Sequence, residues 1–196
     1  MAKRGYHHGN LREALTGAAL ALIVQKGPQG FTLSEAARQA GVTPAAIYRH
    51  FAGRDDLIAE VARQGYGLFA AMLADLDETA PGLRVRAMAR AYLAFAEDHP
   101  GHYIAMFESG IDIARRPALA RAAGEARDLL HAGCAGLGPD TGEIAAHIWS
   151  LSHGVVELYL RNSAGLNHPP EARALLARAL DTYLSGLAAP ASHNSR

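Results

Sequence analysis

Apolar residues recur three and four positions apart along most of this chain, which is the spacing of one face of an α-helix. No segment of the sequence alternates apolar and polar residues as a half-buried strand does, and no internal repeat is present. The pattern therefore predicts an all-α fold. Helices are expected over residues 11–26, 33–40, 44–50, 54–77, 83–98, 101–109, 117–136, 141–163 and 170–188.

Two capping patterns mark where the first two helices are expected to begin. Asn10 is a good N-cap, and Glu13 three residues later can complete a capping box. Thr32 and Glu35 repeat this pattern at the second helix, which we expect to end at Gly41.

A tight turn at Gly41 leads into the third helix. Thr43 is the expected N-cap, and Pro44 occupies the first helical position, where its missing N–H costs nothing. Ile47 and Phe51 lie four residues apart and are expected to point to the core. Two short helices joined by a glycine turn and preceded by a third are typical of a helix-turn-helix DNA-binding unit.

The opposite face of the third helix suits the major groove of DNA, because small side chains allow close approach and longer ones reach phosphates or base edges. This face consists of Pro44, Ala45, Tyr48 and Arg49. Arg54, with the free N–H groups at the start of the fourth helix, is a candidate phosphate contact. Lys3 and Arg4 can follow the DNA backbone or enter a minor groove. The plain alternative is a helical hairpin with a solvated basic face.

Charge is distributed unevenly, although the formal net charge of the chain is +0. Residues 1–54 contain seven Lys and Arg against two Glu, a net charge of +5, so the remainder carries −5. This asymmetry favours contact between the N-terminal segment and a polyanion.

Composition restricts the class of protein further. Hydrophobic residues make up 49% of the chain, enough for a substantial core, and Cys134 is the only cysteine, so no disulfide can form within the chain. The N-terminus lacks an apolar signal segment, and no uncharged apolar run reaches the length of a membrane span. We therefore expect a cytoplasmic protein without membrane contact.

Residues 10–60, and above all the run FTLSEAARQAGVTPAAIYRHFAGRDDLI (31–58), resemble the DNA-binding domain of the TetR family of repressors. The resemblance covers the capped second helix, the glycine turn, the Tyr48-x-His50-Phe51 run and the start of the fourth helix. It implies an all-helical homodimer that places one recognition helix on each half-site of a palindromic operator, with a variable C-terminal domain for ligand and dimer contacts. By position it implies DNA contacts at Thr43, Pro44, Ala45, Tyr48 and His50, and contacts to the DNA backbone at Thr32, Leu33 and Arg54.

A narrower resemblance lies in the C-terminal half. Residues 149–154 (WSLSHG) resemble the Trp-x-x-x-His-Gly signature of one TetR C-terminal subgroup, and the opening residues 6–12 (YHHGNLR) fit members of that subgroup too. This resemblance supports the family but names no ligand.

A mostly apolar group of residues with a few polar members is the candidate effector site. It consists of Phe95, His102, Tyr103, Met106, Phe107, Trp149, His153 and Glu157. Taken singly, each is more often a core residue, and Trp149 and His153 are first interpreted as a packed Trp beside a hydrogen-bonded His. The composition of the group favours a small, largely apolar effector with one polar or cationic end.

Other functions rest on weaker patterns. Glu143 and His147, and likewise His153 and Glu157, have the i, i+4 spacing of paired metal ligands, and Cys134 allows a redox sensor, so a metal- or redox-responsive regulator of the same fold is the alternative. No phosphate loop, nucleophile elbow, metalloprotease helix or dinucleotide fingerprint is present, so we expect no enzymatic activity and no cofactor. A helical interaction module that has lost DNA binding is a third class.

These inferences predict a helix-turn-helix domain with an N-terminal arm over residues 1–54 and a helical ligand-binding and dimerisation domain over 55–190, followed by a disordered tail over 191–196. The last two helices are expected to pair with a second copy. The predicted function is a transcriptional repressor that a small molecule releases from its operator.

Overall fold

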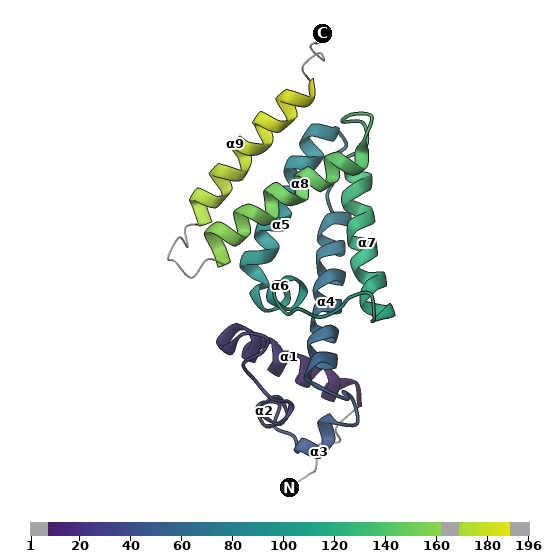
Figure 1. The fold of residues 1–196 in the computed structure, drawn as a ribbon, viewed down its shortest axis with the longest axis vertical. Coiled ribbons are helices and arrows are strands. Elements are labelled where there is room, and N and C mark those ends of the chain that lie inside the picture. Colours follow the sequence, from purple (N-terminus) through teal and green to yellow (C-terminus); the bar gives the residue numbers. More distant parts are fainter. Residues whose placement is uncertain (1–7, 162–168, 189–196) are drawn as a thin grey trace, which may run out of the picture. The chain divides into compact units, whose positions relative to one another are not determined.

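A computed structural model of the protein describes residues 8–161 and 169–188, with side chains from Leu11 onward. Within these ranges the chain is helical and contains no strand, as predicted (Figure 1). The helices are α1 (His8–Lys26), α2 (Leu33–Gln39), α3 (Pro44–Ile47), α4 (Arg54–Ala74), α5 (Pro81–Asp98), α6 (Pro100–Phe107), α7 (Pro117–Gly133), α8 (Thr141–Val156), the π-helical segment η1 (Glu157–Arg161) and α9 (Pro169–Ala188). None of the described helices is both long and apolar enough to cross a bilayer.

Several predicted helix boundaries differ from the observed ones, and the differences at α1 and α8 change the interpretation of nearby residues. Helix α1 begins at His8, so Asn10 lies inside the helix and is not its N-cap. A capping residue only favours a start, and nothing in the two preceding residues stops the helix from extending. The helix expected over 141–163 is α-helical only to Val156, after which the backbone continues as η1. Lys3, Arg4 and the predicted tail over 191–196 lie outside the described residues.

The chain packs into two compact units, which are described separately. The first unit contains residues up to Phe69 together with His99–Glu125, and the second contains Ala70–Asp98 together with the chain from Ala126. Helix α4 contributes to both units, so the predicted domain boundary at residue 54 stays a prediction.

Glycines allow helices of the first unit to approach one another closely. A Cβ atom on Gly65 of α4 would lie 2.6 Å from the sulfur of Met106 and 3.0 Å from Cβ of His102, both on α6. A Cβ atom on Gly101 of α6 would lie 2.9 Å from a methyl group of Leu20 on α1. Helix α6 therefore packs directly against the helix that precedes the helix-turn-helix.

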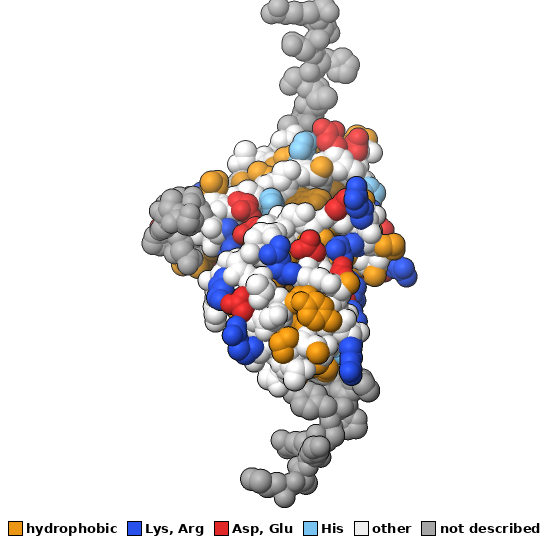
Figure 2. All heavy atoms as spheres, turned by 60° about the horizontal axis from the view of Figure 1, so that its bottom comes forward, with side chains coloured by type: hydrophobic (Ala, Val, Ile, Leu, Met, Phe, Trp, Pro, Cys, Tyr) orange, Lys and Arg blue, Asp and Glu red, His pale blue; other side chains and the backbone are white. Residues whose placement is uncertain are grey.

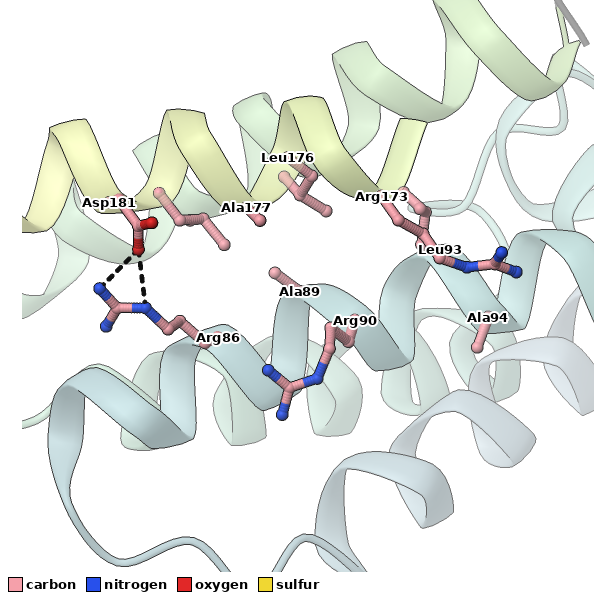
Figure 3. A pocket seen from close by; sticks show the side chains of 10 residues that line it. Arg86, Ala89, Arg90, Leu93, Ala94, Arg173, Leu176, Ala177 and Asp181 are labelled. Atoms are coloured by element: carbon pink, nitrogen blue, oxygen red, sulfur yellow. Dashed lines mark hydrogen bonds and ion pairs between the residues drawn. The ribbon is translucent and has the colours of Figure 1, made fainter. Parts of the chain in front are cut away.

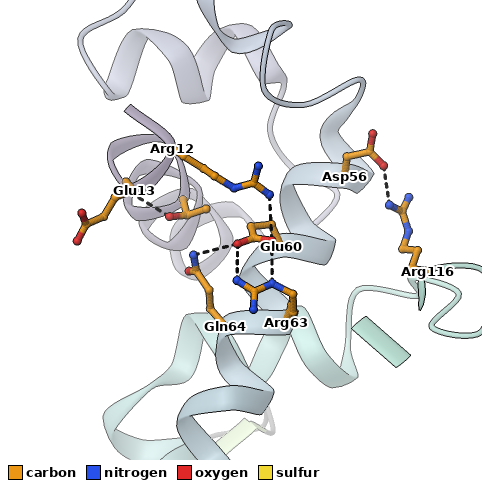
Figure 4. Close-up of polar contacts among 8 residues, drawn as sticks. Arg12, Glu13, Asp56, Glu60, Arg63, Gln64 and Arg116 are labelled. Carbon is orange, nitrogen blue, oxygen red and sulfur yellow. Dashed lines mark hydrogen bonds and ion pairs between the residues drawn. The ribbon is translucent and has the colours of Figure 1, made fainter. Parts of the chain in front are cut away.

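An ion-pair cluster joins α1 to α4 in the same unit (Figure 4). Glu60 accepts from Arg63 at 2.7 Å and pairs with Arg12 at 3.1 Å, and these partners lower the pKa of the Glu60 carboxyl from its usual value. The Arg12 guanidinium also lies 5.1 Å from the centroid of the Phe51 ring. The cluster therefore fixes α1 against the start of α4.

Helices α5, α8 and α9 pack against one another in the second unit (Figure 1). Their shared core includes the fully buried Phe95, Ile148 and Leu180. Arg86 on α5 donates two hydrogen bonds to Asp181 on α9, at 3.0 and 2.7 Å. Apolar packing and this ion pair together hold α9 along α5.

Candidate nucleic-acid interface

The turn between α2 and α3 has the geometry that a helix-turn-helix requires. Gly41 adopts a φ of +72°, its N–H donates to the Arg38 carbonyl at 3.1 Å, and the Val42 N–H donates to the Ala37 carbonyl at 2.9 Å. These two hydrogen bonds form a Schellman motif, which ends α2 and reverses the chain within two residues. Because a side chain at positive φ is strained, glycine is the residue that suits this position.

The predicted capping box at the start of α2 is confirmed. The Glu35 N–H donates to the Thr32 hydroxyl at 3.2 Å, and the Thr32 N–H donates to the Glu35 carboxylate at 2.9 Å. Lys26 donates to the same carboxylate at 2.8 Å, and these hydrogen bonds lower the pKa of Glu35 to about 2. The carboxylate therefore stays ionised at neutral pH and ties the end of α1 to the start of α2.

The third helix is shorter than predicted. Its α-helical part ends at Ile47, and the chain continues to His50 in turns whose N–H groups bond three residues back, from Arg49 to Ala46 and from His50 to Ile47. This tighter winding turns each successive side chain further around the axis than an α-helix does. Ile47 and Phe51 are nevertheless both buried, as predicted.

Most residues predicted to contact DNA lie on one exposed surface. Thr43 occupies the N-cap position without a side-chain hydrogen bond to the helix, which leaves its hydroxyl available. Tyr48 is 58% exposed, one of the most exposed large apolar side chains among the described residues. The exposed members of the predicted set are Thr32, Thr43, Pro44, Ala45, Tyr48 and Arg49, while His50 is half-buried.

Leu33 departs from this arrangement, because its side chain is only 6% exposed and belongs to the core. Only its backbone N–H, at the free N-terminal end of α2, remains for a phosphate. The Leu33 position borders a hollow of about 340 Å³, which is also lined by Thr32, Tyr48 and Arg54.

Arg54 has a structural role that the sequence did not reveal. It donates to the backbone carbonyl of Gln29 at 3.2 Å and also to the Gln29 side-chain oxygen. Gln29 in turn donates to the Ser109 carbonyl at 3.1 Å, just beyond the end of α6. The only sequence signal for Gln29 was its place in the Gly-Pro-Gln-Gly turn, so this contact was missed.

The basic residues of the N-terminal segment are not equally available to a polyanion. Arg12 is engaged by Glu60, Lys26 by Glu35 and Arg54 by Gln29. Arg38 and Arg49 are exposed and form no ion pair with any described residue. Figure 2 shows Lys and Arg side chains on either side of an exposed hydrophobic group at this end of the molecule.

The predicted effector residues divide between the two units. His102, Tyr103, Met106 and Phe107 lie on α6 in the first unit, where the Phe107 ring is edge-on to Tyr66 at 6.0 Å. Burial, and to a smaller extent the neighbouring His99, lowers the pKa of His102, so its neutral form is favoured.

The remaining four, Phe95, Trp149, His153 and Glu157, belong to the second unit. Nδ1 of His153 lies 2.8 Å from the Tyr92 hydroxyl, so the prediction of a hydrogen-bonded His is confirmed. Trp149 is 39% exposed, so its side chain is covered only in part in the single chain, and its packing stays a prediction. Tyr92 was missed, because its partner is distant in the sequence.

In each of the two i, i+4 pairs considered as metal ligands, the two side chains lie near each other. Nε2 of His147 lies 4.0 Å from Glu143, and Nε2 of His153 lies 4.0 Å from Glu157. Among the residues that the structure describes, no three His, Cys, Asp or Glu side chains are grouped to hold a metal ion. Cys134 is buried, and burial raises the pKa of its thiol to about 11, the opposite of what a reactive thiolate needs.

Sequence comparison places both halves of the chain in one group of proteins. The family described as "Bacterial regulatory proteins, tetR family" matches residues 15–61, and the family described as "Tetracyclin repressor-like, C-terminal domain" matches residues 85–183. An uncharacterized HTH-type transcriptional regulator, YobS of Bacillus subtilis (strain 168), is 30% identical over 96 residues. That match covers 48% of this chain and spans about half the length, 50%, of the relative.

Solved structures share the fold over nearly the whole chain. A protein of unknown function from Rhodococcus sp. RHA1 is 28% identical with a TM-score of 0.80, covering 95% of this chain and all (100%) of that one. The transcriptional regulator FadR from Bacillus subtilis, solved in complex with stearoyl-CoA, is 16% identical with a TM-score of 0.72, covering 89% of this chain and 98% of that one.

Proposed function

Because the chain belongs to the TetR family of bacterial transcriptional regulators, we propose that it is a homodimeric repressor released from its operator by a small molecule. DNA binding is supported by the exposed surface formed by α3 and the turn after it. This surface consists of Thr43, Pro44, Ala45, Tyr48 and Arg49. This surface follows a Schellman turn that fixes α3 relative to α2, as major-groove reading requires.

Tyr48→Ala is expected to weaken operator binding by roughly tenfold, because an exposed contact to a base or phosphate is lost while the core stays intact. Arg49→Ala should weaken binding and also reduce its salt dependence, since one phosphate contact fewer releases fewer counterions. Operator DNA selected from a random library, or the DNA flanking its own gene, serves as the probe in a mobility-shift assay.

The matched control is Arg121→Ala, which removes an exposed arginine from α7. It should bind the operator as the parent chain does. Parent-like affinity in both the Tyr48 and the Arg49 variants would contradict DNA reading by this surface and favour the interaction-module alternative.

Release by a ligand is supported by contacts between the reading elements and the segment after α6. Gln29 holds Arg54 at the start of α4 and also bonds the Ser109 carbonyl. Arg116, beyond α6, pairs with Asp56 of α4 at 2.5 Å. A ligand that displaced α6 would therefore shift the loop before α2 and the start of α4 together.

Such a ligand must bind the DNA-free state better than the DNA-bound state, and linkage makes the effect reciprocal. We expect any compound that raises the thermal midpoint of the free protein and releases the operator to lose affinity by the same factor when the operator is present. Titrating that compound with and without operator DNA measures this factor. Equal affinities would show that the compound is not the inducer.

The proposed dimer uses the outer faces of α8 and α9. Ala146, Ser150, Gly154 and Leu158 follow one another at four-residue intervals, so they share a face along α8 and η1. A Cβ atom on Gly154 would meet nothing within 4 Å in the single chain. A row of small residues followed by an exposed leucine allows the α8 and α9 helices of a second copy to pack closely here and form a four-helix interface.

A further inference from the structure

A groove runs between α5 and α9 in the second unit (Figure 3). Its residues come from one stripe on each helix, repeated every three or four positions, and both stripes combine small or apolar side chains with charged ones. On α5 they are Arg86, Ala89, Arg90, Leu93 and Ala94, and on α9 Arg173, Leu176, Ala177, Leu180 and Asp181.

The groove stays open because alanines occupy positions where larger residues would fill the space between the helices. Leu93 and Leu180 are almost fully buried and form its floor. Ala89, Ala94 and Ala177 are too short to close it, as Figure 3 shows, and a volume of about 420 Å³ remains. This volume lies within the roughly 300–1,000 Å³ of small-molecule sites.

The charged residues around the groove are three arginines and one aspartate. Arg86 is neutralised by Asp181, and Arg173 is paired with Glu97, which lies outside the groove lining. Arg90 is different, because its side chain is 68% exposed and it approaches Glu78 only to 3.8 Å. An exposed guanidinium beside an apolar floor offers several N–H donors to an anion whose body lies in the groove.

We propose that this groove binds an amphipathic anion, with an unbranched apolar chain along the leucine floor and a carboxylate or phosphate on Arg90. None of the predicted effector residues lines this groove, so the groove is distinct from the effector site considered above. The assignment does not depend on how the chain reads DNA or on what releases it, so its failure would leave the proposed function unaffected.

Four probes that share a ten-carbon unbranched chain and differ in the charge of the head group separate the two contributions: decanoate, decyl phosphate, decanol and decyltrimethylammonium. Titration calorimetry of the full chain, below the micelle concentration of each probe, is expected to give at least tenfold tighter binding for an anion than for the alcohol or the cation. Comparing the affinities of decanoate and decyl phosphate shows whether the groove prefers a carboxylate or a phosphate ester. Equal binding of all four probes would overturn the proposal.

Two variants test the location. Ala177→Leu should fill the groove and weaken anion binding at least tenfold without loss of fold, because leucine is a good helix former at an exposed position. Arg90→Gln should remove the preference for anions over decanol, whereas Arg178→Gln, on α9 but not among the residues that line the groove, should keep it.

Parent-like anion binding by both groove variants would place the anion elsewhere and refute the assignment. Sedimentation of the Ala177→Leu variant addresses a second copy as the occupant. Dissociation of the dimer with unchanged anion affinity would make the groove a subunit interface and overturn the proposal.

Discussion

A Leu158→Glu variant is expected to be a folded monomer that binds operator DNA roughly 10²–10⁴-fold more weakly than the parent chain. In a dimer, binding of one DNA-binding domain to its half-site raises the effective concentration of the other domain at the second half-site. This increase is lost when the dimer dissociates. Leu158 is 53% exposed in the single chain, so the glutamate costs little in the fold of the monomer. In a symmetric dimer the same carboxylate would be buried twice without a partner.

Leu83→Glu is the matched control, since Leu83 is 59% exposed and belongs to α5, which is not part of the proposed interface. Like Leu158→Glu, it replaces an exposed leucine by a glutamate, and it should leave both the dimer and the operator affinity unchanged. Sedimentation gives the mass of each variant, and the mobility-shift assay gives its affinity. A Leu158→Glu protein that stays dimeric would refute the proposed interface.

Gly30→Ala is expected to lower the free energy of unfolding by about 3 kcal/mol, the upper end of the cost of overpacking. A Cβ atom on Gly30 would lie 2.0 Å from the backbone carbonyl oxygen of Lys26, which ends α1. Because the atom that it meets is backbone and not the end of a flexible side chain, the loop before α2 must move. That movement would displace Gln29 and loosen Arg54, so operator affinity should fall as well.

Gly17→Ala is the control for this substitution. Gly17 lies within α1, and a Cβ atom there would meet nothing within 4 Å. Its replacement by alanine should stabilise the protein by about 0.5–1 kcal/mol, because glycine is a poor helix former. Urea unfolding followed by circular dichroism compares the two variants, and parent-like stability of Gly30→Ala would contradict the steric argument.

The amino-acid sequence by itself determined the helical fold and the helix-turn-helix. Its signals act over a few residues: the capping box of Thr32 and Glu35, the glycine turn at Gly41, and the spacing of Ile47 and Phe51. The hydrogen bonds and side-chain contacts involved connect residues that are no more than about one helical turn apart in the sequence. Residue types and their spacing are therefore enough to predict them. The match to the TetR family extends over this same segment.

Tertiary structure alone decided which side chains meet across larger separations. Arg54 bonds Gln29, 25 positions away, and Tyr92 bonds His153, 61 positions away. The open groove between α5 and α9 depends on which face each helix turns toward the other, which helical periodicity leaves undetermined. Periodicity fixes the position of a residue around its own helix axis, whereas packing of several helices decides what that residue contacts.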